Sequence, residues 1–262
     1  MTKIIAIIQA RTGSTRLPGK VLLPLEDKTV LEHVIERTRK SRLIDKTIVA
    51  TSIKKQDLPI VKICAGKKIQ VFTGSETNVL DRYYQAARLF LPDNIVRITA
   101  DCPAIDPVII DKTITKHLKE NADYTTNNLI PTYPHGLDLE IFTFKALEQA
   151  WKKAKKPSEK EHVSPYIRYN PSLFKITGIE YKKNIKDKRW TLDEPRDYEL
   201  LKIIFKNVYT KKPNFLMEDI LKFLKANPEV EKINCGISRN EGYLKSLKED
   251  EIFMDRIKRK KE

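Results

Sequence analysis

Short apolar runs alternate with amphipathic segments over the first hundred residues of the chain. The first run, Ile4–Ile8, has no polar position, which is typical of a strand buried on both faces in the centre of a parallel sheet. Further strands are expected at 46–51, 69–72 and 94–99. A helix is expected at 29–40, before the strand at 46–51, and another at 56–67, before the strand at 69–72. This order of strands and helices predicts an α/β domain with a parallel sheet and right-handed crossovers.

The second half of the chain continues the alternation less regularly. Asp106 is expected to cap a helix that begins at Pro107, and the alternation of Leu137, Leu139 and Ile141 predicts a strand with one polar face. No repeat or low-complexity linker divides the chain into two clear domains. We expect a Rossmann-like α/β domain, a small β insertion within it and a helical C-terminal extension, at residues 1–210, about 127–190 and 211–262.

The loop after the first apolar run combines glycines with cations. In open α/β sheets, ligands bind just outside the carboxyl ends of the strands, which is where this loop begins. Gly13 and Gly19 allow tight turns that present backbone N–H groups, while Arg11, Arg16 and Lys20 suit phosphate oxygens. Ser14 and Thr15 add hydroxyl donors to the same loop. These residue types favour a triphosphate as the ligand.

Two common phosphate-binding patterns are excluded for this loop. The Walker A pattern fails because Val21 follows Lys20, and the GxGxxG pattern is also absent. The alternative interpretation is an ordinary basic surface loop. The two glycines, Ser14 and the preceding buried strand favour phosphate binding over that alternative.

The stretch QARTGSTRLPGKVL resembles the nucleotide-binding signature of cytidylyltransferases that activate acidic sugars. These include 3-deoxy-manno-octulosonate and acylneuraminate cytidylyltransferases, and the likeness is closest to the spore coat polysaccharide biosynthesis group. Gln9 stands where the signature usually has Pro, a departure shared by the spore coat group. The resemblance covers about residues 1–210. It implies a three-layer nucleotidyltransferase fold of the nucleotide-diphospho-sugar transferase type.

The resemblance also implies which residues contact the nucleotide. Thr51 and Ser52 follow the second expected strand, and GSETNVLDRYYQAA, after the third, resembles the spore coat group. Asp81 and Arg82 could instead be an ordinary solvated pair on a helix. The expected nucleotide-binding residues are Gln9, Ala10, Arg11, Gly13, Ser14, Arg16, Lys20, Thr51, Ser52, Ser75 and Arg82, of which Arg11 and Lys20, with Asp101, are expected to be catalytic.

Two aspartates are the expected metal ligands. Asp101 lies in RITADCPAIDP, which resembles the family's metal-binding motif, although Ala100 stands where Gly is common. Asp193, in the segment Trp190–Asp197, matches the residue that returns a second carboxylate to the metal. Mg²⁺ prefers such oxygen ligands and takes others from water and substrate phosphates. The alternatives are a turn or capping role for Asp101 and a helix N-cap for Asp193.

Three further residues are expected to bind the sugar. Asp138 and Glu140 lie in a segment that matches the family's Gly-x-Asp-x-Glu motif on the sugar side of the cleft. His162 lies in a Glu-His-Val segment, where an imidazole can donate to a carboxylate or hydroxyl. The alternatives are an exposed position for Glu140 and a structural role for His162.

Composition adds limits rather than a function. The net charge of +15 attracts anionic substrates or nucleic acid, but the lysines are spread along the chain and no nucleic-acid module is present. Three widely spaced cysteines, Cys64, Cys102 and Cys235, suggest neither a zinc site nor a disulfide framework. Without a membrane-spanning run or a signal-peptide pattern, a cytoplasmic protein is expected. A homodimer is expected from the resemblance alone.

Together these features predict transfer of CMP from CTP to an acidic sugar of the 2-keto-3-deoxy type, with Mg²⁺ as cofactor and release of pyrophosphate. An acceptor that is a sugar phosphate or polyol phosphate is the first alternative. A non-catalytic protein that binds nucleotide or nucleic acid is the second. The ordered family-like segments favour the enzyme, and nucleic acid is not expected as a partner.

Overall fold

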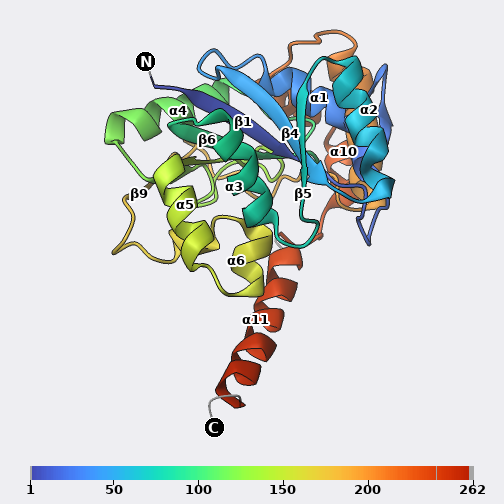
Figure 1. Ribbon diagram of the computed structural model, residues 1–262. Helices are drawn as coiled ribbons and strands as arrows, with labels where there is room; N and C mark the ends of the chain where they lie inside the picture. Colours follow the sequence, from blue (N-terminus) through green and yellow to red (C-terminus); the bar gives the residue numbers. More distant parts are fainter. Residues whose placement is uncertain (1, 240, 260–262) are drawn as a thin grey trace.

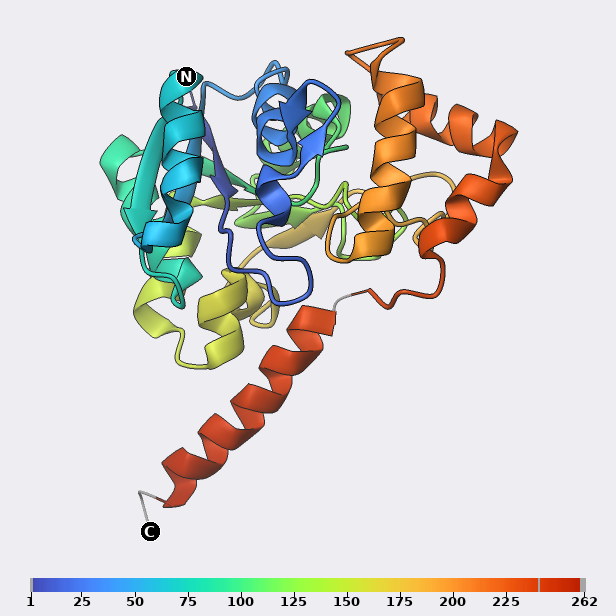
Figure 2. The same ribbon diagram turned by 90° about the vertical axis from the view of Figure 1, so that its right-hand side faces the viewer.

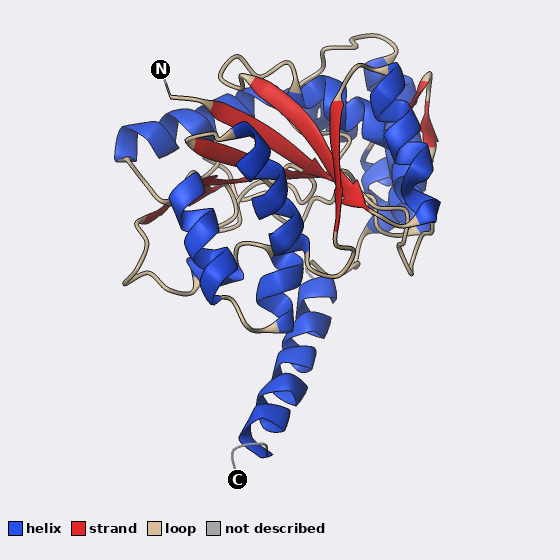
Figure 3. Ribbon diagram, viewed as in Figure 1, coloured by secondary structure: helices blue, strands red, loops and turns tan. Residues whose placement is uncertain are grey.

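The computed structural model describes residues 2–239 and 241–259. A seven-stranded sheet forms the middle layer, and helices cover both of its faces (Figure 1; Figure 3). The strand order is β5-β4-β1-β6-β8-β7-β9. The strands are β1 (Ile4–Gln9), β4 (Lys46–Ser52), β5 (Gln70–Gly74), β6 (Asn94–Thr99), β7 (Tyr124–Thr126), β8 (Glu140–Thr143) and β9 (Ile176–Gly178). A separate two-stranded ribbon pairs β2 (Pro24–Leu25) with β3 (Lys28–Thr29).

The first four strands of the order β5-β4-β1-β6 are parallel, as the sequence predicts. In β1, Ile7 lies opposite Ile48 of β4 and Arg97 of β6. β8 runs antiparallel to both of its neighbours, β6 and β7. Because the parallel strands all end at one edge, the loops that follow β1 and β6 meet there.

Alternate residues of β1 enter two different cores. Ile4, Ala6 and Ile8 pack with helices on one face of the sheet, whereas Ile5 and Ile7 pack on the other. The first face carries α1 (Val30–Thr38), α2 (Leu58–Gly66), α4 (Pro107–Glu120), α8 (Pro195–Ile204) and α9 (Met217–Ala226). The second carries α3 (Val79–Phe90), α5 (Phe144–Lys153) and α7 (Pro165–Arg168). The helices on both faces explain why the first strand has no polar position.

Helix ends are fixed by carboxylates and hydroxyls. Thr29 and Glu32 form a reciprocal capping box at the start of α1. Asp106 caps α4, as expected, since its Oδ1 accepts from the N–H of Val108 at 2.8 Å. Its Oδ2 accepts from the N–H of Met217 at 2.7 Å, which ties the first turn of α9 to the body.

Some boundaries differ from those expected. Helix α5 ends at Lys153, and Pro157 begins a separate short helix, α6 (Pro157–His162), because proline is favoured in a first turn. The strand expected from Leu137 begins only at Glu140. Segment 127–190 contains three helices and two strands, β8 and β9, and both strands belong to the main sheet.

The chain after α8 is helical in the parts that the structure describes. A π-helical turn (Phe205–Tyr209) leads to α9, then to α10 (Pro228–Glu231), a 3-10 turn (Lys232–Asn234) and α11 (Glu241–Arg259). α11 begins beside the body and runs away from it (Figure 2). Residues 240 and 260–262 of the expected extension lie outside the described residues. Two other 3-10 turns span Lys20–Leu22 and Lys55–Asp57.

Candidate functional site

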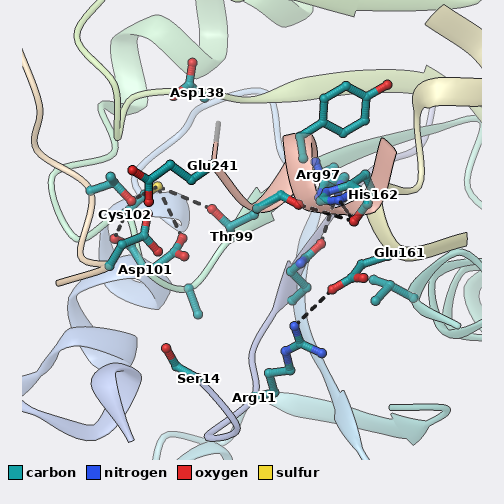
Figure 4. Close-up of a pocket in the computed structure, with 18 of the residues that line it drawn as sticks. Arg11, Ser14, Arg97, Thr99, Asp101, Cys102, Asp138, Glu161, His162 and Glu241 are labelled. Atoms are coloured by element: carbon teal, nitrogen blue, oxygen red, sulfur yellow. Dashed lines mark hydrogen bonds and ion pairs between the residues drawn. The ribbon is translucent and has the colours of Figure 1, made fainter. Parts of the chain in front are cut away.

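A cavity of about 610 Å³ lies at the carboxyl ends of β1 and β6 (Figure 4). Its wall includes the loop after Gln9, the turn after Thr99 and segments from the second half of the chain. Most of the residues expected to act are brought together there. They are Gln9, Ala10, Arg11, Gly13, Ser14, Arg16, Lys20, Arg82, Asp101, Asp138, Glu140, His162 and Asp193.

Lys20 links the two aspartates that the sequence suggested as metal ligands. Its Nζ lies 2.7 Å from Asp101 Oδ2 and 2.7 Å from Asp193 Oδ1. Burial alone would lower the pKa of Lys20, but the two carboxylates outweigh burial and raise that pKa. Burial works to raise the pKa of Asp101, yet Lys20 holds it well below its usual range. Lys20 and Asp101 are therefore both charged at neutral pH.

A buried arginine orients Asp193. Arg189 is 6% exposed, and its guanidinium donates to Asp193 Oδ2 at 3.1 Å and to both oxygens of Asp197 at 2.9 Å. Asp197 Oδ2 also accepts from the backbone N–H groups of Asp193 and Glu194, at 3.0 Å each. Asp197 thus performs the capping role at α8 that was the alternative for Asp193. The Asp193 carboxylate is left facing the cavity.

The loop that carries Arg11, Arg16 and Lys20 is held in place by Asp57. Asp57 Oδ1 accepts from the N–H of Thr12 at 2.7 Å and from its hydroxyl at 2.6 Å. Gly19 has a φ of +68°, a left-handed conformation that favours glycine. Its N–H is used within the loop, because it donates to the Thr12 carbonyl at 2.9 Å. Gly19 therefore shapes the turn, and its own N–H is paired within the loop.

The two loop arginines reach acidic side chains across the cavity. Arg11 Nη2 lies 3.2 Å from Glu161, and Arg16 lies 3.3 Å from Asp193 and 2.9 Å from Glu241. Both arginines are more than a third exposed, so these pairs are weak in water. A polyanionic ligand can therefore replace these carboxylates at small cost.

A second buried ion pair forms another part of the wall. Arg97 Nη1 donates to Glu140 Oε2, and Glu140 Oε1 accepts from the hydroxyls of Tyr124 and Ser164 at 2.5 Å each. Burial would raise the pKa of Glu140, but Arg97 and the two hydroxyls lower it below its ordinary value. Gln9 Oε1 accepts from Arg97 Nε at 3.1 Å, a bond that a proline there cannot make.

The alternative of an exposed Glu140 is wrong, because its side chain is 14% exposed and fully paired. Arg82 is likewise not part of a solvated pair with Asp81. Arg82 is 1% exposed and donates to the Ser75 carbonyl, while Asp81 accepts from the Trp151 indole at 2.9 Å.

Three of the expected nucleotide-binding residues lie outside the lining of this cavity. The Ser52 hydroxyl donates to Asp57, which helps to hold the loop. Ser75 Oγ accepts from the N–H of Asn78, at the start of α3. Thr51 is fully buried, and its hydroxyl has no partner among the residues described. Their contacts with a nucleotide remain predictions.

Asp138 and His162 line the side of the cavity expected to hold the sugar. Asp138 Oδ1 accepts from Arg239 at 2.5 Å, and His162 Nε2 lies 2.9 Å from the Ser246 hydroxyl. Burial lowers the pKa of His162, so the imidazole is neutral at neutral pH. Gly136 is needed here, because a Cβ on it would lie 2.5 Å from backbone atoms of the segment that bears Arg189.

Several residues of the site were missed from the sequence. Arg97 had a signal, since a charged residue in the middle of the apolar strand 94–99 needs a partner. Arg189 and Asp197 flank Asp193 but gave no separate sign of their pairing. Glu161, Arg168 and the first turns of α11 also line the cavity, and only the folded chain brings them there.

A model of the cytidylyltransferase family matches residues 5–228 of the chain. The chain belongs to the cytidylyltransferase family. The likeness of the loop at 9–22 to cytidylyltransferases is therefore confirmed, and the chain is a nucleotidyltransferase. Its mixed α/β architecture, with a mainly parallel sheet, is that of the expected fold class.

Three relatives define this membership of the cytidylyltransferase family more closely. The spore coat polysaccharide biosynthesis protein SpsF of Bacillus subtilis is 34% identical over 236 residues, which is 87% of this chain and 97% of the relative. A solved cytidylyltransferase structure from Leptospira borgpetersenii superposes with a TM-score of 0.85 at 34% identity, covering 91% of this chain and all of that one. A 3-deoxy-manno-octulosonate cytidylyltransferase of Trichlorobacter lovleyi is 39% identical over 116 residues, 44% of this chain and 45% of the relative.

Three further observations concern metal ligands, helix hydrophobicity and cysteines in this cytidylyltransferase. Within residues 2–239 and 241–259, no group of three or more His, Cys, Asp or Glu side chains is placed to hold a metal ion. Any ion at Asp101 and Asp193 therefore needs further ligands from a substrate or water. None of the described helices is long and apolar enough to cross a membrane. The three cysteines are free.

Proposed function

We propose that this cytidylyltransferase transfers CMP from CTP to a hydroxyl of an acidic sugar and releases pyrophosphate. One observation carries the proposal. Lys20 Nζ lies 2.7 Å from both Asp101 and Asp193 at the ligand edge of the sheet, beside a loop that presents Arg11 and Arg16. Cations and convergent carboxylates are what a metal-bound triphosphate requires.

The two aspartates fit a divalent cation, for which Mg²⁺ is the proposal. Their carboxylates already converge on one cationic group, and Mg²⁺ is usually held by one or two carboxylates plus substrate phosphates. When bound, Mg²⁺ supplies positive charge to the triphosphate. Arg189 would keep the Asp193 carboxylate aimed at this position through its 3.1 Å bond.

The remaining residues align the substrates. Arg11 and Arg16 would exchange their weak carboxylate partners for phosphate oxygens, and Lys20 would donate to the phosphates from the same wall. No covalent protein nucleophile is needed, because catalysis rests on alignment and on neutralising charge. Neutral His162 and the carboxylate of Asp138 would bind sugar hydroxyls without placing a titrating cation there.

Two observations support an acidic sugar as the acceptor. One is the cavity wall that carries Asp138 and His162, and the other is the name of the Trichlorobacter lovleyi relative. The match to that relative covers less than half of either chain. A sugar phosphate or polyol phosphate would use the same nucleotide half of the site. A homodimer remains a prediction from the resemblance, as do the domain boundaries near residue 210.

The test is pyrophosphate release with Mg²⁺, each of the four nucleoside triphosphates and a panel of acceptors. The panel contains 3-deoxy-manno-octulosonate, N-acetylneuraminate and sugar phosphates. Release with CTP and a sugar acid is expected. If pyrophosphate is released with CTP only when the acceptor is phosphorylated, the acceptor is a phosphorylated compound and not a sugar acid. If another triphosphate supports release in place of CTP, the proposal that CTP is the donor is wrong.

A further inference from the structure

α11 is fastened to the catalytic body through a buried carboxylate. Asp250 is 8% exposed. Its Oδ1 accepts from the N–H of Ser158 at 2.9 Å, and its Oδ2 accepts from the Ser158 hydroxyl at 2.5 Å. Ser158 lies in α6, the short helix that also contains Glu161 and His162 of the cavity wall. The first half of α11 is thus held beside the site, while its last turns point away from the body (Figure 2).

One face of this first half lines the cavity. The lining residues of α11 are Glu241, Gly242, Tyr243, Lys245, Ser246 and Glu249. Positions 242, 245, 246 and 249 have the spacing of neighbours on one helical face. The family model ends at residue 228, so this wall comes from a part of the chain that the model does not match.

α11 also sets the position of a residue on the sugar side. Ser246 Oγ lies 2.9 Å from His162 Nε2, and the Tyr243 ring meets the His162 ring edge-on with centroids 5.1 Å apart. Glu241 reaches the other end of the cavity, where it pairs with Arg16. The helix therefore spans the cavity from the phosphate loop to His162.

Lys245 differs from most cations of the wall. Arg11, Arg97 and Arg189 each pair with a carboxylate, whereas no carboxylate of the described chain lies within ion-pair distance of Lys245. Lys245 is exposed to the cavity and precedes Ser246, the partner of His162. An unpaired ammonium at this place suits an anionic group on the molecule that His162 contacts.

We propose that α11 forms one wall of the acceptor pocket and that Lys245 binds the anionic group of the acceptor. This inference rests on the proposed function, since it takes the cavity beside His162 as the acceptor side. Lys245 is then a specificity-determining residue. It would favour carboxylated or phosphorylated acceptors over neutral sugars, through a charge that the catalytic residues do not supply.

The chain offers a matched control for this lysine. Lys248 lies on the same helix three residues later and is also exposed, but it is not among the residues that line the cavity. The variants Lys245→Glu and Lys248→Glu change the net charge equally. Only the first places a negative charge on the cavity wall.

The experiment is calorimetric titration of 3-deoxy-manno-octulosonate, and separately of glucose 1-phosphate, into full-length protein saturated with CMP. Lys245→Glu should weaken binding of the anionic sugar by about tenfold or more, while Lys248→Glu leaves it within about twofold of the wild type. Lys245→Gln should show a smaller loss in the same direction. CMP affinity should be unchanged in all variants. The probe that binds tells a carboxylate from a phosphate as the recognised group.

Two outcomes would overturn the inference. They are equal losses in Lys245→Glu and Lys248→Glu, and no binding of either probe to the wild-type protein. Pyrophosphate release is measured separately on the wild type. Probe binding that depends on Lys245 without any release would leave α11 as an anion-binding wall and overturn the proposed function instead.

Discussion

Two ionic networks line the same cavity but are built in different ways. In the first, the long side chains of Lys20 and Arg16 reach from a loop to Asp101 and Asp193. In the second, Arg97 and Glu140 face each other in register on β6 and β8, and two hydroxyls complete the carboxylate. The two cations of the first network lie in the loop region after β1, whereas Arg97, the one cation of the second, lies in the sheet.

This difference separates binding from support. A ligand can replace the partners of Lys20 and Arg16, because these side chains are long and their backbone belongs to a loop. Arg97 and Glu140 cannot separate without leaving two buried charges unpaired, which is costly. We infer that the first network exchanges partners during the reaction and that the second is a fixed floor of the site.

The largest expected effect is the loss of activity in Asp101→Asn. The amide keeps the shape of the side chain but removes the charge that faces the phosphates, so kcat/KM for CTP should fall by about 100- to 1000-fold or more. Stability should change little, because Lys20 keeps Asp193 as a partner at 2.7 Å. The measurement is steady-state pyrophosphate release together with a thermal melt.

Asp187→Asn is the control for that substitution. Asp187 is exposed and lies outside the cavity lining, so its loss should leave kcat/KM unchanged. If Asp101→Asn keeps wild-type turnover, the assignment of Asp101 to the nucleotide and metal is wrong.

Glu140→Gln should have the next largest effect, and it should appear in stability. The substitution leaves Arg97 buried without its counter-charge, which we expect to lower the free energy of unfolding by about 3 kcal/mol. Urea titration of the wild type, Glu140→Gln and Asp101→Asn gives the comparison directly. If Glu140→Gln is as stable as Asp101→Asn, the Arg97–Glu140 pair contributes no more to stability than the Lys20 network, and the distinction between support and binding is wrong.

The smallest expected effect is the pH dependence of the difference in unfolding free energy between the wild type and Glu140→Gln. The pKa of Glu140 is lowered in the folded protein by Arg97, Ser164 and Tyr124, which outweigh burial. Its contribution to stability is therefore fully present above the ordinary glutamate pKa of 4.5 and is lost as pH falls through the lower folded value. Unfolding free energies at several pH values should show the gap between wild type and Glu140→Gln narrowing below about pH 4.5. A gap that stays constant or widens on acidification would contradict this origin.

The sequence predicted the parts of the site that depend on the parallel sheet. Strand ends place Lys20 and Asp101 at one edge, and motif resemblance added Asp193 from far along the chain. The start of α8 was predicted less well, since the alternative for Asp193 was to cap that helix. In the structure Asp197 accepts from the backbone N–H groups of Asp193 and Glu194, which leaves Asp193 to face the cavity.

The remaining parts could not be read from the sequence, for physical reasons. Arg97 and Glu140 are paired by the antiparallel register of β6 and β8, which local patterns do not set. α11 lies on the cavity because one carboxylate, Asp250, is buried against Ser158. A single polar residue on a helix does not indicate, from the sequence, that its side chain will be buried against a partner. The Ser52 hydroxyl supports the loop through Asp57, a contact that no local pattern indicates, and its contact with a nucleotide stays a prediction.

The central claim is that the Lys20 network, with Asp101 and Asp193, receives a metal-bound nucleotide. Calorimetric binding of CTP to the wild type and to Asp193→Asn, each with Mg²⁺ and with a chelator, tests it most directly. We predict that removing Mg²⁺ weakens CTP binding to the wild type by about tenfold or more, and that Asp193→Asn loses most of this dependence. Equal CTP affinity with and without Mg²⁺ in the wild type, or an undiminished Mg²⁺ effect in Asp193→Asn, would contradict the account.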